Sequence, residues 1–204
     1  YQRSNIMQPG FVGGSKPGFV GGVCLEKDPH ILLDLVDSNG LDGSLIRAVR
    51  TINESLPGQV FERVKQHIES KNKNLDNAKI FITGLALKGR PGPDALRGSP
   101  ALKLLSILKK FNAKNIYAHD FVVKEESIKS LGLNPCSLQK GMANADVVIF
   151  MNNHKNYDEV AIEELVKNVN QEALIFDGWQ LFDEKLKNVN NINYESIGFR
   201  RRKN

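Results

Sequence analysis

The sequence contains little cysteine. Cys24 and Cys136 are the only two among 204 residues, too few for the disulfide framework of a small secreted protein. The chain also has no apolar run long enough to cross a bilayer, and no signal peptide is visible at its start. We therefore expect a protein of the reducing cytoplasm with no membrane partner. Hydrophobic and charged fractions of 41% and 25% predict a globular fold.

Three binding signatures are missing as well. No Gly-x-Gly-x-x-Gly follows a predicted strand, so the dinucleotide-binding fingerprint is absent. No cysteine and histidine residues have the spacing of a zinc site, and we expect no bound metal. The net charge is +5, and much of it lies in the tail at 200–203. Because no aromatic residues interleave with this charge, we expect no nucleic acid partner.

The first part of the chain predicts two helices. One extends from Pro29 to about Ser38, with Asp28 as its N-cap, and Asn39-Gly40 ends it. The second covers 42–71 and has a single apolar stripe at three-four spacing. Pro57 lies inside this stripe and is expected to kink or split the helix. The pattern alone leaves two partners open for the stripe, a second subunit or the chain's own following domain.

After a polar linker at 72–74, strand and helix patterns alternate. This alternation predicts an α/β fold with a doubly wound, mostly parallel, Rossmann-like sheet. Ligands of such sheets bind outside the carboxyl ends of the strands. The expected strands are 79–84, 115–119, 134–137, 145–151, 173–177 and 194–197, and the expected helices are 99–111, 125–131 and 158–169.

Cys24 follows a glycine-rich loop. Pro-Gly-Phe-Val-Gly-Gly occurs at 9–14 and again at 17–22, and only the second copy leads into the cysteine. A cysteine within a few residues of a helix N-terminus is favoured as thiolate, because the helix dipole and free N–H groups stabilise negative charge. Cys24 is thus a candidate nucleophile. The alternative is a small structural cysteine in a turn.

A second candidate site is the loop from Leu87 to Ser99. Lys88 and Arg97 flank its Pro-Gly-rich centre and precede the helix that Ser99-Pro100 begins. Two cations beside a helix N-terminus can bind phosphate. The alternative is a solvated basic loop.

Two further sites follow predicted strands. His154 belongs to the loop 152–155 that directly follows the strongest strand, and a hydrogen-bonded structural histidine is favoured there over a catalytic base. Asp177-Gly178-Trp179 follows the strand at 173–177.

The chain resembles the C-terminal half of the UDP-glucose/GDP-mannose dehydrogenase family. The motifs that carry the resemblance are Gly-Gly-x-Cys-Leu-x-Lys-Asp-Pro at 21–29, the segment 47–53, Gly-Leu-Ala-Leu-Lys at 84–88, Leu-Arg-Gly-Ser-Pro at 96–100 and Phe-Asp-Gly at 176–178. The resemblance implies that Cys24 is the catalytic nucleophile and that Asp28 assists it. It assigns cofactor-phosphate binding to Arg97 and substrate binding to five residues: Phe19, Gly21, Gly22, Leu87 and Lys88.

The chain departs from the family pattern at two places. Ala95 stands where an aspartate usually follows Asp94, and Trp179 stands where many members have a substrate-binding arginine. Because a tryptophan lacks that charge, the sequence does not determine which sugar nucleotide is the preferred substrate.

The resemblance also implies an organisation and an activity. Residues 1–28 would form the active-site loop segment, 29–74 a helical dimerisation segment and 75–204 a UDP-sugar-binding α/β domain. The family oxidises the C6 alcohol of a UDP-sugar to a uronic acid with NAD, through a cysteine thiohemiacetal and thioester, for polysaccharide precursors. The helix at 42–71 would form a homodimer.

The family's NAD-binding domain would precede Tyr1, so we expect this chain to be inactive alone. Two alternatives stay open. One is a non-catalytic module that binds UDP-sugar and dimerises, and the other is an unrelated doubly wound domain.

Overall fold

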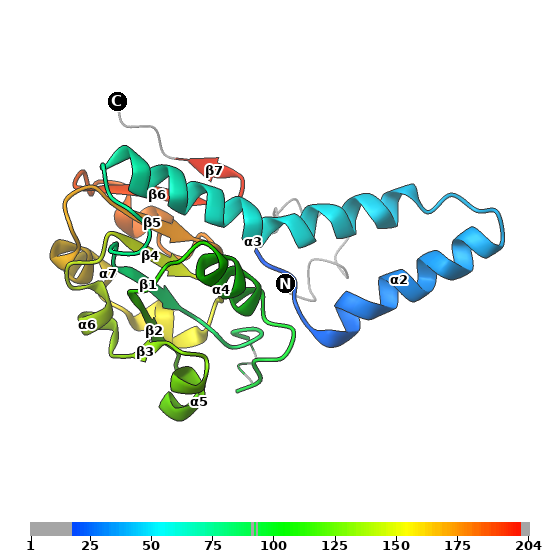
Figure 1. Cartoon of the computed structure of the whole chain (residues 1–204), viewed down its shortest axis with the longest axis horizontal. Coiled ribbons are helices and arrows are strands. Elements are labelled where there is room, and N and C mark those ends of the chain that lie inside the picture. The colour runs from blue at the N-terminus through cyan, green and yellow to red at the C-terminus, as the bar shows by residue number, and fades with distance from the viewer. Residues whose placement is uncertain (1–17, 91, 93, 201–204) are drawn as a thin grey trace.

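Two helices form an arm that extends from an α/β domain (Figure 1). The computed structural model describes residues 18–90, 92 and 94–200. The first copy of the duplicated hexapeptide therefore lies outside the described residues. Helix α2 (Val23–Ser38) forms one side of the arm. Helix α3 (Ser44–Ser70) forms the other side and continues onto the domain.

Helix α3 continues through Pro57 as one element, so the expected split is wrong. A proline removes one helical amide and places a ring against the preceding turn. In α3 the Pro57 ring is buried. The stretch that follows it presents Val60, Phe61, Val64 and Ile68 to the domain, and all four are buried. Their burial stabilises the helix beyond the proline.

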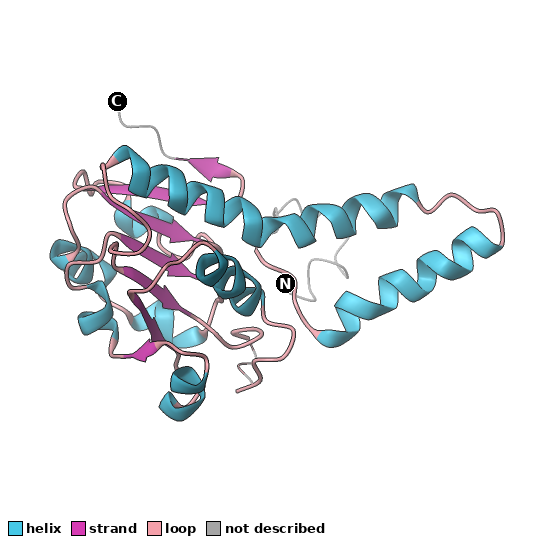
Figure 2. Cartoon of the chain, in the orientation of Figure 1, coloured by secondary structure: helices cyan, strands magenta, loops and turns pink. Residues whose placement is uncertain are grey.

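The domain contains one sheet of seven strands in the order β3-β2-β1-β4-β5-β6-β7. All neighbouring strands are parallel except β6 and β7, which are antiparallel. Figure 2 shows the strands side by side with helices on both faces. The strands are β1 (Ile80–Thr83), β2 (Ile116–His119), β3 (Asn134–Pro135), β4 (Val147–Phe150), β5 (Ala173–Asp177), β6 (Ile192–Ser196) and β7 (Phe199–Arg200).

Alternation along the strands separates two cores, because successive side chains of a strand point to opposite faces. Ile80 and Ile82 of β1 belong to one core, whereas Phe81 belongs to the other. The first core includes residues of α3, of α4 (Pro100–Lys110) and of α5 (Glu125–Ser130). The second includes residues of α6 (Leu138–Met142), α7 (Ile162–Leu165) and α8 (Asp183–Leu186). The predicted doubly wound, mostly parallel fold is confirmed.

One predicted helix is wrong. Instead of a helix over 158–169, the chain forms η1 (Lys155–Glu159), the short α7 and η2 (Val166–Asn168). Lys185 Nζ donates hydrogen bonds to the carbonyls of Asp158 and Val160 at 3.2 and 3.3 Å. Because a side chain from a distant helix bonds these carbonyls, tertiary contacts replace the regular helical pattern. Helices α6 and α8 and strand β7 were not predicted.

The switch in strand order lies between β1 and β4. From β1 the chain extends outward through β2 and β3, and from β4 it extends the other way through β5 and β6. The loops that follow β1 and β4 therefore share one end of the sheet. In a doubly wound sheet this end is where ligands bind.

Candidate active site at the carboxyl ends of the strands

Cys24 is the second residue of α2, and it is an exposed free thiol. The helix begins at Val23, directly after Gly22, whose φ of 111° is favourable only for glycine. The expected N-cap at Asp28 is wrong, because the helix begins six residues before the predicted start and includes Pro29. The cysteine therefore lies in the first turn of the helix, where the backbone favours an anion.

Asp28 lies four residues after Cys24 in the same helix. Residues at this spacing share one helix face. The Asp28 carboxylate is more than half exposed and pairs with the neighbouring Lys27 at 2.5 Å. An exposed thiol and a carboxylate thus lie on one accessible surface.

The loop before α2 is attached to the rest of the molecule at several points. Asn53 of α3 holds Val20 on both sides: its Oδ1 accepts from the Val20 N–H at 3.1 Å, and its Nδ2 donates to the Val20 carbonyl at 2.7 Å. The Gly22 N–H donates to the Gly98 carbonyl at 3.0 Å. These bonds fix the path of the chain just before Cys24.

Phe19 and Gly18 pack on the turn after β5. The Phe19 ring is buried and lies close to Gly178. A Cβ added at Gly178 would lie 2.4 Å from a carbon of the Phe19 ring. Gly18 packs on the Trp179 ring in the same way. A Cβ added at Gly18 would lie 2.4 Å from the nearest carbon of that ring. The Trp179 indole donates to the Met151 carbonyl at 3.1 Å. Trp179 and the Phe19 side chain are therefore used to hold this chain's own loop.

The Lys88–Arg97 loop meets the cysteine loop directly. A Cβ on Gly21 would lie 2.6 Å from the Gly98 carbonyl oxygen and 3.1 Å from a methyl of Leu87. A second link joins the helices, because Lys103 of α4 pairs with Glu26 of α2 at 2.6 Å. The structure thus brings together two segments that are far apart in the sequence.

Lys88 and Arg97 are both exposed. Within the described part of the chain, neither side chain forms an ion pair. Ser99 begins α4 as predicted, since its Oγ accepts from the Ala101 N–H, and it also donates to the Leu85 carbonyl. Arg97 lies just before the N-terminus of α4, and Lys88 belongs to the same loop, so the loop has the residue types that suit a phosphate.

Other polar residues of this region are structural. Arg90 forms two hydrogen bonds to the Asp158 carboxylate, at 2.6 and 2.7 Å, and so ties the loop to η1. His154 is buried, caps η1 through Nδ1 and stacks on Phe121. The favoured structural role of His154 is in accord with these contacts.

Two titratable groups, the buried Asp177 and the partly buried His119, lie at the carboxyl end of the sheet. Asp177 accepts from the Trp179 N–H, the Phe182 N–H and the Tyr194 hydroxyl. Burial raises its pKa, against the lowering effect of these bonds. His119 lies beside Thr83, with 3.1 Å between Nδ1 and Oγ1, and burial lowers its pKa.

Sequence analysis missed the supporting residues Arg50, Asn53 and Asp120. Asp120 accepts from the Ala86 N–H at 2.8 Å, and thereby holds the base of the loop that carries Lys88. The available signal for Arg50 and Asn53 was the family motif at 47–53, which contains both residues.

In the part of the chain that the structure describes, no group of three or more His, Cys, Asp or Glu side chains could hold a metal ion. No helix of that part is long and apolar enough to cross a membrane.

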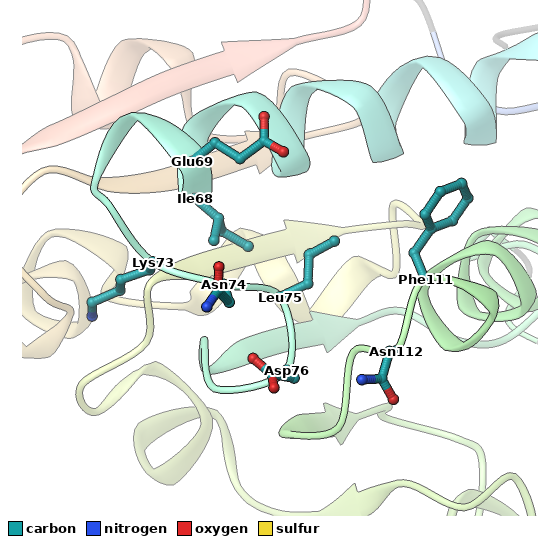
Figure 3. A pocket seen from close by; sticks show the side chains of 8 residues that line it. All are labelled: Ile68, Glu69, Lys73, Asn74, Leu75, Asp76, Phe111 and Asn112. Atoms are coloured by element: carbon teal, nitrogen blue, oxygen red, sulfur yellow. The ribbon is translucent and has the colours of Figure 1, made fainter.

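A pocket of about 280 Å³ lies at the opposite end of the domain (Figure 3). The end of α3, the following linker and the end of α4 form it, and it contains none of the predicted site residues. Because the strands begin at this end, it is the wrong end of the sheet for a ligand of a doubly wound fold.

Comparisons with known proteins match this architecture. Residues 81–184 match the UDP-glucose/GDP-mannose dehydrogenase family, UDP binding domain, and residues 3–55 match the central domain of the same family. UDP-N-acetyl-D-mannosamine dehydrogenase from Pyrococcus horikoshii is 33% identical over 169 residues, which are 82% of this chain and 37% of that protein. The Campylobacter jejuni protein of the same name is 31% identical, over 81% of this chain and 38% of that protein.

Solved structures show the same similarity. A UDP-D-ManNAc dehydrogenase structure from Pyrococcus horikoshii has a TM-score of 0.73 and 28% identity, and the match covers 95% of this chain and 42% of that chain. A Methanosarcina mazei NDP-N-acetyl-D-galactosaminuronic acid dehydrogenase has a TM-score of 0.69 at 20% identity, over 90% of this chain and 39% of that chain; it supports the fold alone. The present chain thus spans less than half the length of these relatives.

Proposed function

Because this chain belongs to the UDP-glucose/GDP-mannose dehydrogenase family, we propose that it forms the substrate side of an NAD-dependent nucleotide-sugar dehydrogenase. The observation that carries the proposal is the contact between the two loops. The Gly22–Gly98 bond places the segment that leads into Cys24 against the segment that contains Lys88 and Arg97. A nucleophile and a phosphate site on adjacent loops suit a sugar that is attached to a diphosphate.

In this proposal, Lys88 and the backbone at Gly21, Gly22 and Leu87 hold the UDP-sugar. Phe19 anchors the loop before Cys24, because its ring packs on Gly178. Arg97 would bind a phosphate of NAD, since it is exposed beside the N-terminus of α4. When bound, NAD would supply the acceptor for both hydrides. Most of the NAD site would lie in the part of the relatives that this chain does not match.

The steps proposed for this chain's residues are those that the family resemblance implies for Cys24 and Asp28. The Cys24 thiolate adds to the aldehyde carbon that the first oxidation of the C6 alcohol produces, and a thiohemiacetal forms. After the second oxidation this carbon is a thioester. Asp28 accepts a proton from water, water adds to the thioester carbon, and the carbon–sulfur bond breaks to release the uronic acid and the thiolate.

UDP binding by calorimetry tests the nucleotide site. Replacement of Lys88 by Ala removes a cation from the phosphates and is expected to weaken UDP binding about 10- to 100-fold. Lys114→Ala is the matched control, because Lys114 is exposed at the other end of the sheet, just before β2. Equal affinities in both variants would contradict the placement of UDP at Lys88.

Thiol alkylation tests the nucleophile. Cys24 is expected to react faster than the half-buried Cys136 near neutral pH, and a UDP-sugar should protect only Cys24. We expect the 204-residue chain to produce no NADH by itself. NADH formation with any UDP-sugar would refute that expectation.

We further propose a homodimer through the arm. Within the described residues, α2 and the first half of α3 expose a set of large apolar side chains, a patch typical of protein interfaces. This set includes Leu25, Ile31, Leu32, Leu35, Leu45, Val49 and Ile52. The predicted interface covered the whole of 42–71. The proposed interface contains only the first half of α3, together with α2, because the second half of α3 is buried against its own domain.

A further inference from the structure

Helix α2 contains a proline near its start, and this leaves one carbonyl without a helical partner. In an α-helix the amide of residue 29 would donate to the carbonyl of residue 25. Pro29 has no amide hydrogen. The carbonyl concerned belongs to Leu25, the residue directly after Cys24.

Arg50 of α3 takes the place of the missing amide. Its Nη1 donates to the Leu25 carbonyl at 2.8 Å. The Arg50 side chain is only 8% exposed, so its guanidinium is held in one place. Its other donors, Nε and Nη2, bond the Glu54 carboxylate, with 3.1 Å from Nε. Glu54 thus orients the guanidinium so that one edge faces Leu25.

The same turn of α3 holds the chain on the other side of the cysteine. Asn53 bonds both backbone groups of Val20. Arg50 and Asn53 therefore fix the backbone after and before Cys24, from one rigid helix. The side chain of Cys24 itself stays exposed for a substrate.

We propose that Arg50 is a positioning residue for Cys24, and this rests on the proposed function of Cys24 as nucleophile. By bonding the Leu25 carbonyl, Arg50 keeps the first turn of α2 formed across Pro29. That turn contains Cys24 and the N-terminal N–H groups of the helix, which favour a thiolate. Arg50 takes no part in the chemistry and acts only through the helix backbone.

A double-mutant cycle with Pro29 tests this assignment. Arg50→Met removes the donor, and Pro29→Ala returns a backbone amide to the same carbonyl. The two measurements, made on the full chain, are hydrogen exchange of the peptide 22–28 and the alkylation rate of Cys24 relative to Cys136. Arg50→Met is expected to speed exchange by about tenfold, as for loss of a hydrogen bond to a charged group, and to slow alkylation of Cys24.

Pro29→Ala in the Arg50→Met background should reverse at least half of both effects. A general loss of stability would not be repaired at this one carbonyl, so the rescue separates positioning from a merely structural role. Arg47→Met is the matched control, since Arg47 also joins α3 to α2, through Asp37 at the far end of α2. It should leave both measurements unchanged.

The outcomes separate this proposal from the proposed function. Unchanged exchange in Arg50→Met, or an equal effect with and without Pro29, would overturn the positioning role. If Arg50→Met does not fold, Arg50→Lys keeps one donor and should show the smaller effect, again reversed by Pro29→Ala. Alkylation of wild-type Cys24 no faster than Cys136 counts against the nucleophile, whereas exchange and rescue still decide the role of Arg50.

Discussion

The two halves of helix α3 have the same apolar spacing and opposite surroundings. Before Pro57, Leu45, Val49 and Ile52 are 75%, 56% and 62% exposed. After it, Val60, Phe61, Val64 and Ile68 are at most 2% exposed. The second half lies on α4 and β5, and the first half forms the arm with α2. The comparison shows that periodicity identifies an apolar face and leaves its partner undetermined.

The largest expected effect distinguishes the two halves by stability. Phe61→Ala removes a buried ring that packs on Phe111 at 4.6 Å between centroids. We expect the free energy of unfolding to fall by about 3–5 kcal/mol, because a cavity remains in the core. Urea unfolding measures this. Ile52→Ala, on the exposed half, should change it by no more than about 0.5 kcal/mol when the protein concentration is low enough to keep the chain monomeric, and a similar loss in both variants would remove the distinction.

The next effect concerns association. Val49→Lys with Ile52→Lys places two charges on the exposed half, and we expect the dimer to weaken about 30-fold or more, because charges replace apolar contacts at the interface. Sedimentation velocity at several concentrations measures the dissociation constant. Gln66→Lys is the control on the exposed face of the second half. A wild-type chain that stays monomeric at high micromolar concentration would contradict the arm as a dimer interface.

Between pH 7 and 5, acid should act on the domain through His119. Burial lowers the pKa of His119, so below its ordinary value of 6.5 the unfolded chain binds a proton that the folded chain does not. The free energy of unfolding then falls as the pH decreases from 6.5, by at most about 1.4 kcal/mol per pH unit from this group. Urea unfolding between pH 5 and 7 measures the slope. His119→Asn should flatten it, and an unchanged slope would identify another group.

The smallest effect lies at the junction of the two halves. Gly58 is within α3, and a Cβ there would contact nothing within 4 Å. Gly58→Ala should therefore raise the free energy of unfolding by about 0.5–1 kcal/mol through helix propensity. At Gly43, in contrast, a Cβ would lie 2.7 Å from Leu33. Gly43→Ala should not stabilise the chain, and equal thermal shifts in the two variants would contradict this account.

Much of the fold could be predicted because local patterns and tertiary structure agree. Buried strands such as β1, β4 and β5 are short apolar runs between turn residues, and the Ser99-Pro100 pair begins α4 where expected. Two of the failures occur where side chains from elsewhere bond the backbone, and the third, at Pro57, where burial stabilises the helix. Lys185 bonds the carbonyls of the segment expected as a helix over 158–169, and Arg50 bonds the Leu25 carbonyl in α2, which begins six residues before Pro29.

The candidate site could be predicted in part. The residues Cys24, Asp28, Lys88 and Arg97 were named from local motifs and from the family resemblance. Their support by Asn53, Asp120 and the Trp179 ring could not be named, because these residues contact the loops only after the chain folds. Trp179 stands at the position of a substrate-binding arginine in many family members, and in this structure its ring packs on Gly18.

The sequence by itself determined the α/β alternation, the apolar faces of the helices and the residue types that carry the chemistry, since these depend on local pattern. Only the tertiary structure decided that the second half of α3 is covered by its own domain while the first half stays exposed, and that Gly22 meets Gly98 across more than seventy residues of chain. The physical reason is that burial and backbone hydrogen bonds between distant segments depend on how the whole chain packs, and no local pattern encodes the partner.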